Sequence, residues 1–448
     1  MFRGLVPAAG LIATDRRYFG TMSGTSIDFL AELAWRGLLF QQTDGVAVAL
    51  ASSRVAGYCG FDPTADSLHA GNLVAIMALV HLQRAGHRPV ALVGGGTGLI
   101  GDPSGKSAER SLRTREEIDA NVAAIRAQLA RVLDFDGPHG ALLVDNGDWL
   151  RELRLLDFLR DTGKHFTVNY MLQKDSVSSR MASESGISFT EFSYMLLQAH
   201  DFAELHRRHG VTLQVGGSDQ WGNITAGTTL VRKLHGIEAH GVTLPLMTTA
   251  AGTKFGKSEA GAVWLDAART TPYAFHQFFL QSDDRDVGRW LRTFTLLDRA
   301  TIEALDATTQ SAPEQREAQR VLAREVTTLI HGADAARTAE ELAVLLFRKG
   351  DPATLSDDAL AALAREVPFT SVTAADDGTL DVLALFTATG LTESKGAARR
   401  LLQQGGLTIN GGKLSPADTS LRTDRLLRGG HLLLRKGARD YGLVRVIP

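Results

Sequence analysis

The sequence is poor in cysteine, with Cys59 as its one thiol among 448 residues. A single thiol excludes an intramolecular disulfide framework and a metal cluster built on several cysteines, and it predicts a reducing compartment, the cytoplasm. Long hydrophobic runs are also missing, because no apolar stretch approaches the roughly 18–20 residues that a membrane-spanning helix needs. The hydrophobic content of 44% is typical of a globular protein, and the length allows two or three domains.

An excess of charge of one sign is absent from the chain as a whole, whose formal net charge is −2. That average gives no nucleic-acid signature, although it can hide a local one. From Asp381 to Pro448 the sequence has eleven Lys and Arg residues but five Asp and Glu residues, so this segment carries +6 and the residues before it carry −8. The C-terminal segment is therefore the basic part of the chain.

The N-terminus combines an early arginine, Arg3, with a short apolar segment, so a signal or transit peptide has to be considered. The segment is short, and Pro7 and Gly10 break it. We expect residues 1–21 to be a disordered extension that precedes an original start at Met22.

Strand-like and helix-like segments alternate through the first half of the chain, which predicts an α/β fold with a mostly parallel sheet. Strands are expected at residues 54–61 and at "RPVALVG", "ALLVDN" and "VTLQVGG", and helices at residues 66–86, 113–135 and 188–210. The changes of pattern predict an extension at 1–21, a first domain at 22–269, a helical domain at 270–350, a linker at 351–380 and a small α+β domain at 381–448.

The stretch "GGGTGLIGDPSGKS" at residues 94–107 contains fragments of two nucleotide-binding patterns. Residues 96–101 fit GxGxxG, but the last glycine of that pattern must open a helix, and Pro103 and Gly105 stand where the helix would run. A P-loop needs a glycine five positions before Gly105, where this sequence has Ile100. The stretch therefore argues against both a dehydrogenase and a P-loop NTPase.

Two other segments suit phosphate binding. In "YCGFDPTADSLHAGN" (58–72) a strand ends in a glycine-containing turn, and His69 and Asn72 follow on one face of the first helical turn. Helix N-terminal amides with two side-chain donors can hold phosphates. In "GTKFGKSEAG" (252–261) two lysines lie in a glycine-bordered loop. Taken singly, the first segment could hold a histidine that only packs near a helix end, and the second could be a solvated turn.

Together, "HAGN" (69–72) and "KFGKS" (254–258) resemble the HIGH and KMSKS signatures of class I aminoacyl-tRNA synthetases. The segments "YCGFDPTADSLH", "GKHFTVNYML", "ISFTEFSYMLLQAHDF" and "QVGGSDQWGNITAG" look like bacterial-type tyrosyl-tRNA synthetases in order and spacing, from about Ser26 to the C-terminus. The resemblance implies a Rossmann-like catalytic domain with a dimer-interface insertion at about 113–180, a helical anticodon-side domain and a small ribosomal-protein-type RNA-binding domain.

The resemblance also implies a tyrosine site. Tyr58 and Asp201 would receive the phenolic hydroxyl of tyrosine, and Tyr194, Gln198 and Asp102 would surround its ammonium group, with Gln220 close to its carboxylate. The helical spacing agrees, because positions i, i+4 and i+7 of the predicted helix 188–210 lie within about 60° of one another. A core tyrosine beside incidental polar residues is the alternative for any one of these positions.

On the ATP side, the resemblance implies contacts from Cys59, Gly60, Asp62, His69, Asn72, Gly217, Asp219 and Lys257. The residues expected to act in catalysis are Thr64, His69, Asn72, Lys106, Arg110, Lys254, Lys257 and Ser258. Most of them are donors or cations suited to charge that develops on phosphates. No protein-bound metal is expected, and ATP is expected as its Mg²⁺ complex.

The reaction that the resemblance implies is activation of L-tyrosine by ATP to tyrosyl-adenylate, followed by transfer to the 3′ end of tRNA(Tyr). A homodimer is implied as well. In "LTESKGAARRLLQQGGLTINGGKL" a helix carrying Lys395, Arg399 and Arg400 gives a basic surface suited to RNA phosphates, and a solvated basic face is the alternative.

Three other protein classes share part of this pattern. A nucleotidyltransferase of the HxGH type would share the first site, but it would be shorter and would not need "KFGKS". A non-enzymatic RNA-binding relative could lose His69 or Lys257, and both are present. Tryptophanyl-tRNA synthetase shares the fold but should lack the pair Tyr58 and Asp201.

Overall fold

The computed structural model describes residues 27–104, 113–137, 140–182, 186–258, 261–348 and 350–447. The described chain forms two compact units: the first runs to Arg269 and includes residues 282–322, and the second holds residues 270–281 and those from Ala323 onward. The boundary thus runs through the helical domain expected at 270–350. The extension expected at 1–21 lies outside the described residues. No helix among the described residues is long and apolar enough to cross a membrane.

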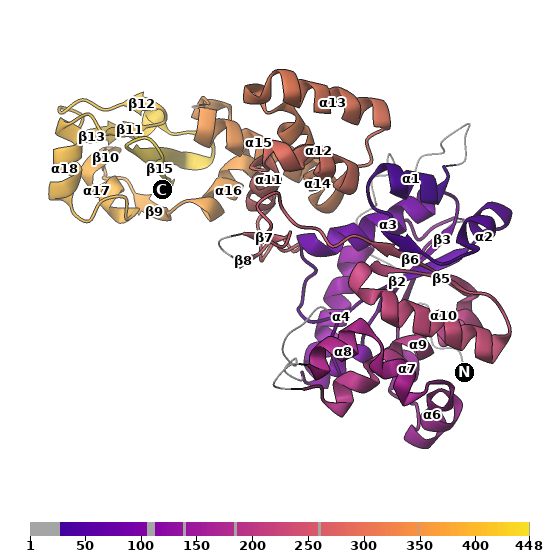
Figure 1. Ribbon diagram of the computed structural model, residues 1–448. Coiled ribbons are helices and arrows are strands. Elements are labelled where there is room, and N and C mark those ends of the chain that lie inside the picture. The colour runs from indigo at the N-terminus through magenta and orange to yellow at the C-terminus, as the bar shows by residue number, and fades with distance from the viewer. Residues whose placement is uncertain are drawn as a thin grey trace. The chain divides into compact units, whose positions relative to one another are not determined.

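A six-stranded sheet forms the centre of the first unit (Figure 1). Its strands in spatial order are β1 (Gln41–Gln42), β6 (His240–Leu244), β5 (Val211–Gly217), β2 (Ala56–Phe61), β3 (Arg88–Val93) and β4 (Leu142–Asp145). Neighbours from β6 to β4 are parallel, and only β1 of this sheet is antiparallel, which confirms the predicted fold class. The strand order reverses between β2 and β5, and such a reversal opens a ligand crevice at the carboxyl ends of the strands.

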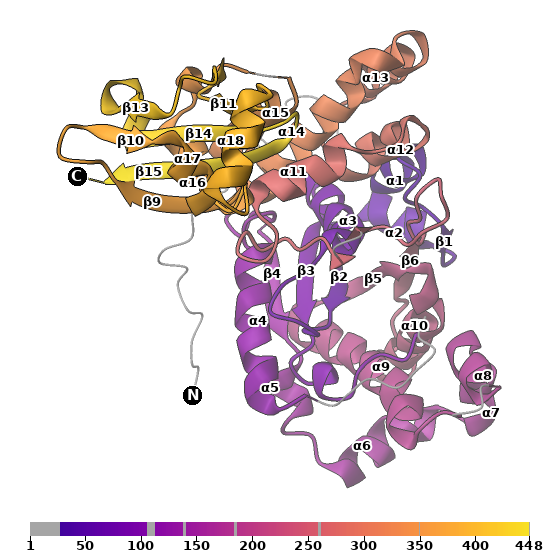
Figure 2. The ribbon, with the colours of Figure 1, turned by 90° about the vertical axis from the view of Figure 1, so that its left-hand side faces the viewer.

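Helices cover both faces of this sheet because successive side chains of a strand alternate (Figure 2). Gly57 faces α3 (Leu73–Arg84), where an added Cβ would lie 2.8 Å from Leu82. Tyr58 faces α9 (Phe189–His209), with its ring centroid 5.1 Å from that of Phe202. Other helices of this unit are α1 (Phe29–Trp35), α2 (Val46–Ser52), α4 (Arg115–Leu129), α5 (Gly147–Leu150), α6 (Leu155–Asp161), α7 (Val168–Leu172), α8 (Asp175–Met181), α10 (Trp221–His235), α12 (Asp284–Phe294) and α13 (Arg299–Ser311).

Helix ends follow local signals where these are strong. α9 begins after the N-cap Ser188, whose hydroxyl accepts the amide of Glu191, and ends at Gly210 with φ +66°, as the sequence predicts. The helix expected at 66–86 is an exception, because α3 begins only at Leu73 and a 3₁₀ turn, η2 (Ala70–Asn72), precedes it.

The second unit contains helices and a five-stranded sheet. Its helices are α11 (Pro272–Leu280), the end of α14 (Glu317–His331), α15 (Ala333–Arg348), α16 (Asp357–Glu366), α17 (Val382–Ala388) and α18 (Lys395–Gln403). The sheet, in spatial order, is β12 (Gly412–Lys413), β11 (Leu407–Ile409), β14 (His431–Lys436), β15 (Asp440–Ile447) and β9 (Phe369–Thr373), and β10 (Thr379–Asp381) pairs separately with β13 (Ser420–Arg422).

The segment 351–380 does not have the structure of the predicted linker. It holds α16, β9 and the start of β10, and β9 pairs in parallel with β15. Buried Leu360 and Leu363 of α16 share an apolar cluster with Leu433 and Leu443 of the sheet. The five-stranded sheet and the helices packed against it form one C-terminal body, which therefore includes residues well before Asp381.

Candidate active site

A pocket of about 220 Å³ lies at the carboxyl ends of β2, β3 and β5, where the strand order predicts a ligand crevice. α9 supplies one wall, since its residues at i, i+4 and i+7 all face the pocket. The predicted site residues that line it are Tyr58, Cys59, Gly60, Asp62, Asp102, Tyr194, Gln198, Asp201, Gly217, Asp219 and Gln220. The pocket therefore collects residues that are up to 162 positions apart in the sequence.

One end of the pocket is formed by two buried polar side chains, Tyr58 and Asp201. The hydroxyl of Tyr58 is buried and has no hydrogen-bond partner among the described residues. Burial and the neighbouring Asp201 raise the pKa of Tyr58 well above its ordinary value, so it remains a neutral donor. Burial raises the pKa of Asp201 to about 8, against the hydrogen bonds that it accepts, which favours the protonated form of this carboxyl group.

Two residues that the sequence prediction missed hold Asp201 in place. The side-chain amide of Asn146 donates to one carboxyl oxygen of Asp201 at 2.8 Å, and the indole N–H of Trp149 donates to the other at 2.7 Å. Asn146 also accepts the amide of Gly96 at 2.7 Å and donates to Thr97 at 2.9 Å. Asn146 thus ties the glycine-rich stretch after β3 to α9. The signal for it was its position directly after β4, whose end lies beside that of β3.

At the other end of the pocket, polar side chains form a connected network. Asp102 accepts the side-chain amide of Gln220 at 2.7 Å and the backbone amide of Ser104 at 2.9 Å. Burial, reinforced by the carboxylate of Asp62, raises the pKa of Asp102 to about 6 despite these bonds. The hydroxyl of Tyr194 donates to Asp62 at 3.3 Å, and Gln198 donates to Gln220 at 3.3 Å. This end is rich in acceptors and suits a cationic group.

The two signature segments lie against each other. In "HAGN" the backbone amide of His69 donates to the side-chain oxygen of Asn72 at 2.9 Å, which fixes the turn before α3. The amide of Ala70 donates to the carbonyl of Val263 at 2.7 Å, just beyond the lysine loop. Gly256 has φ +85°, and a Cβ on it would lie 2.7 Å from the backbone nitrogen of Gly71. The backbones of "HAGN" and "KFGKS" are therefore in direct contact.

The other predicted catalytic residues occupy different settings. Thr64 is exposed in the turn after β2, where its amide donates to the carbonyl of Asp62 at 2.9 Å. Lys254 is exposed, and the backbone of Lys257 and Ser258 forms β7, paired with β8 (Gly261–Ala262). Two predicted residues, Lys106 and Arg110, lie outside the described residues.

The predicted RNA contacts lie on α18 in the second unit. Arg399 and Arg400 are exposed there. Lys395 is also exposed, but its ammonium group donates to Asp381 at 2.7 Å. The arginines therefore offer more uncompensated charge to a polyanion than the lysine does.

Comparison with known proteins identifies related chains. Residues 51–348 match the family model described as tRNA synthetases class I (W and Y), and residues 359–444 match that of the tyrosine–tRNA ligase SYY-like C-terminal domain. A tyrosine–tRNA ligase of Anaeromyxobacter dehalogenans is 53% identical over 94% of this chain and 99% of its own length, and one of Bacillus caldotenax is 50% identical over 94% and 100%. A C-terminally truncated mitochondrial tyrosyl-tRNA synthetase of Aspergillus nidulans is 31% identical, with a TM-score of 0.64 over 75% of this chain and 97% of that one.

Proposed function

We infer how the site works from one premise: this chain belongs to the tyrosyl-tRNA synthetases of class I. It is a tyrosine–tRNA ligase, which uses ATP to join tyrosine to tRNA. The predicted family, fold class and reaction are thereby confirmed. Because its relatives match over nearly their full length, the nucleotidyltransferase and the non-enzymatic RNA-binding protein are set aside.

For tyrosine, we propose one orientation in the pocket. The buried hydroxyl of Tyr58 and the carboxyl group of Asp201 meet the phenolic hydroxyl, because both need a ligand that can donate and accept. Asp102, Tyr194 and Gln198 surround the ammonium group. Phenylalanine would leave Tyr58 and Asp201 without a hydrogen-bond partner on the ligand, at a cost of about 1–3 kcal/mol. The unpartnered hydroxyl of Tyr58 is the observation that carries this assignment, and it favours tyrosine over tryptophan within a family that includes both.

ATP is proposed to lie beside this pocket, against the "HAGN" turn and the lysine loop. Gly60 is the next-to-last residue of β2 and Gly217 is the last residue of β5, and the absence of side chains there lets the nucleotide approach the backbone. Burial raises the pKa of the Cys59 thiol to about 12. The thiol therefore stays protonated and lines the pocket as a neutral group, not as a nucleophile. ATP is taken to arrive as its Mg²⁺ complex, with the ion belonging to the substrate.

The proposed first step is an in-line displacement. The carboxylate of tyrosine attacks the α-phosphorus of ATP, a new P–O bond forms, and the bond to pyrophosphate breaks, which leaves tyrosyl-adenylate. Positioning and cations that meet the developing phosphate charge supply the catalysis, and no covalent enzyme intermediate is needed. Thr64, His69, Asn72 and Lys254 with Lys257 are proposed for this task. The adenylate then passes its tyrosyl group to the 3′ end of tRNA.

The test of this assignment is ATP–pyrophosphate exchange measured with each of the twenty amino acids. Tyrosine should support exchange far above every other amino acid, including tryptophan and phenylalanine. Exchange that tryptophan supports as well as tyrosine would remove the proposed roles of Tyr58 and Asp201.

Tyrosine binding is expected to weaken as the pH falls through about 6. The free carboxylate of Asp102 attracts the ammonium group, and its pKa of about 6 means that it gains a proton below that pH and loses the attraction. Since one proton is involved, the dissociation constant should rise by at most about tenfold per pH unit. Equilibrium dialysis with labelled tyrosine between pH 5 and 8 measures it, and Asp102→Asn should bind weakly with a flat profile over pH 5–7. An unchanged profile in Asp102→Asn would assign the proton to another group.

A homodimer is also proposed, formed through the helices that follow β4. Leu155, Leu156 and Leu159 share one face of α6 and are 70%, 77% and 46% exposed. α7 and α8 lie near α6 at the same end of the first unit, and they add exposed Val168 and Met181 (Figures 1 and 2). Exposed large apolar side chains gathered at one end of a molecule are typical of an interface. This location agrees with the insertion expected at 113–180.

Leu156→Asp is therefore expected to convert the dimer to monomers at micromolar concentration. Burying a carboxylate in an apolar interface should weaken association at least about thirtyfold, the scale of an interface hot spot. Light scattering coupled to size exclusion reports the mass against 48.2 kDa for one chain. Val48→Asp on α2, where Val48 is 72% exposed, is the matched control and should stay dimeric. A wild-type protein that is monomeric at high concentration would refute the proposal.

The C-terminal body, which is basic from Asp381 onward, is proposed to bind the phosphates of tRNA. Its match to a tyrosine–tRNA ligase C-terminal domain and the exposed Arg399 and Arg400 on α18 support this role. Because the body includes β9, it is proposed to begin before Phe369.

A further inference from the structure

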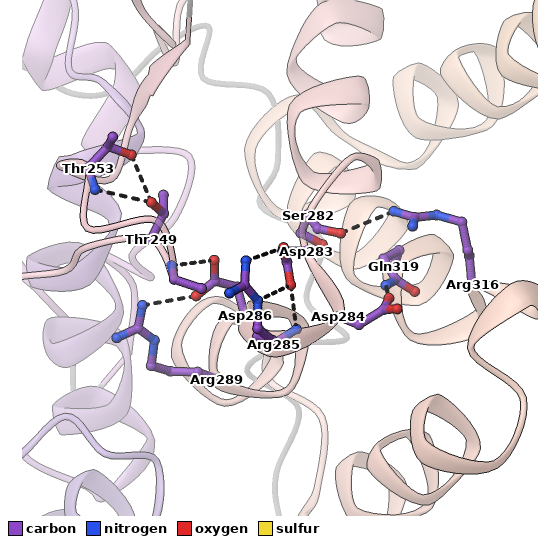
Figure 3. A network of polar contacts seen from close by, with 11 residues as sticks. Thr249, Thr253, Ser282, Asp283, Asp284, Arg285, Asp286, Arg289, Arg316 and Gln319 are labelled. Atoms are coloured by element: carbon purple, nitrogen blue, oxygen red, sulfur yellow. Dashed lines mark hydrogen bonds and ion pairs between the residues drawn. The ribbon is translucent and has the colours of Figure 1, made fainter.

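The segment that leads into "KFGKS" is a closed hairpin, formed by residues 247–255. Thr248 and Lys254 form an antiparallel bridge, and the amide of Phe255 donates to the carbonyl of Met247 at 3.1 Å. The hydroxyls of Thr249 and Thr253 lie 2.7 Å apart across the hairpin (Figure 3). Lys254 is therefore part of a defined structure, and the orientation of this hairpin sets where the two lysines of the loop emerge.

Two polar side chains of α12 hold this hairpin (Figure 3). The carboxylate of Asp286 accepts the backbone amide of Ala250, at the hairpin tip, at 2.8 Å. The guanidinium group of Arg289 donates to the backbone carbonyl of Thr248 and to Asp286. Asp286 is 4% exposed, so its bond to the hairpin is protected from competition by water. Both contacts are made to backbone groups, which fixes the position of the main chain whatever side chains the tip carries.

Two apolar residues of the same helix hold Phe255, which directly follows the first signature lysine. The ring of Phe255, 3% exposed, is stacked on Phe294 with centroids 4.7 Å apart and planes at 17°. The ring of Trp290 meets it edge-on at 4.9 Å and 78°. Asp286, Arg289, Trp290 and Phe294 stand at positions i, i+3, i+4 and i+8, so they share one face of α12, which is directed at the hairpin.

α12 is itself fixed at both ends within the first unit. At its start, Asp284 accepts the side-chain amide of Gln319 at 2.5 Å, and Arg316 donates to the carbonyl of Ser282 at 3.1 Å (Figure 3). At its end, the buried guanidinium group of Arg36 donates to the carbonyls of Arg292 and Thr295 at 2.8 and 2.9 Å. A helix held at both ends is a rigid reference to which a loop can be aligned.

We propose that α12 positions the lysine loop for adenylate formation, with Asp286 and Arg289 as positioning residues that act through Lys254 and Lys257. Neither residue lines the substrate pocket or needs to touch ATP. They align the hairpin so that the lysines meet the phosphates in the transition state, where a small misplacement is costly. This inference rests on the proposed role of the two lysines.

The prediction is that Asp286→Ala slows adenylate formation about 10- to 100-fold while the dissociation constant of tyrosine stays within about twofold of wild type. Asp286→Asn keeps an oxygen that can accept the amide of Ala250, so it should recover most of the rate. Arg285→Ala is the matched control on the same helix, since Arg285 is exposed and contacts Asp283, not the hairpin. Phe255→Met should likewise retain more activity than Phe255→Ala, because a flexible thioether can refill the aromatic site.

The decisive experiment is a double-mutant cycle between Asp286→Ala and Lys257→Ala, read by stopped-flow adenylate formation on variants whose melting temperature is also measured. If Asp286 acts through the loop, its substitution should change the rate little once Lys257 is gone. If Lys257→Ala alone leaves the rate unchanged, the proposed role of the lysine fails. If Lys257→Ala slows the reaction but Asp286→Ala adds its full effect on top, or affects only the melting temperature, the positioning role of α12 is refuted.

Discussion

Lys257→Ala is expected to slow adenylate formation about 10²- to 10³-fold, the usual cost of removing one group that stabilises transition-state charge. Its backbone lies in β7, directly after Gly256, which touches the turn of "HAGN". The backbone at Lys257 therefore lies next to the "HAGN" turn, against which ATP is proposed to bind. Charge on the leaving pyrophosphate grows only as the P–O bond breaks, so the loss should fall on the rate and not on ground-state binding.

The measurement is a quenched-flow rate constant for adenylate formation together with a tyrosine dissociation constant from fluorescence titration. Tyrosine binding should stay within about twofold of wild type. Lys164→Ala, at an exposed lysine of the same domain, controls for the loss of a positive charge. Equal losses in rate and in tyrosine affinity would mean that Lys257 contributes uniform binding, and the assignment would have to be withdrawn.

Asp201→Ala is expected to lower the discrimination between tyrosine and phenylalanine by about 1–3 kcal/mol, or about 5- to 150-fold in the ratio of kcat/KM values. The variant removes one proposed partner of the phenolic hydroxyl, so tyrosine loses a hydrogen bond that phenylalanine never made. It also leaves the amide of Asn146 and the indole of Trp149 without their acceptor. Part of the effect will therefore appear as reduced stability, which thermal unfolding separates from specificity.

Asp201→Asn should be nearly as damaging as the alanine variant. Both carboxyl oxygens of Asp201 accept a donor, and an asparagine offers one oxygen, so its amino group would face either Asn146 or Trp149. The exposed Asp148, one residue from Trp149, provides the control, since Asp148→Ala should leave the kcat/KM ratio unchanged. Full discrimination in a folded Asp201→Ala protein would place the hydroxyl elsewhere.

The sequence predicts those parts of the site whose residues lie close together in the chain, on one helix. Tyr194, Gln198 and Asp201 share one face of a single amphipathic helix with strong caps, so their convergence follows from the helical period. Asn146 and Trp149 were missed because the signal for Asn146, its position directly after β4, indicates the site only once β4 is known to end beside β3. Pairing between parallel strands is a long-range property that periodicity does not reveal.

The fold shows the same division between local and long-range information. The start of α3 was predicted too early because His69 and Asn72 close a 3₁₀ turn first, and no residue type distinguishes such a turn from the first turn of an α-helix. The prediction of a linker at 351–380 was wrong for a different reason. β9 lies at the edge of its sheet with every second residue exposed, so it lacks the apolar run of a central strand, and its partner β15 lies about 70 residues later.

The contact between Gly256 and Gly71 has a consequence for engineering by consensus. The general signature has a serine where this chain has Gly256, yet a serine here would need φ near +85° and would place its Cβ 2.7 Å from the nitrogen of Gly71. Restoring the common residue would therefore push apart the two segments that the signature exists to bring together. A serine at position 256 can therefore be introduced only together with a different backbone path at this contact.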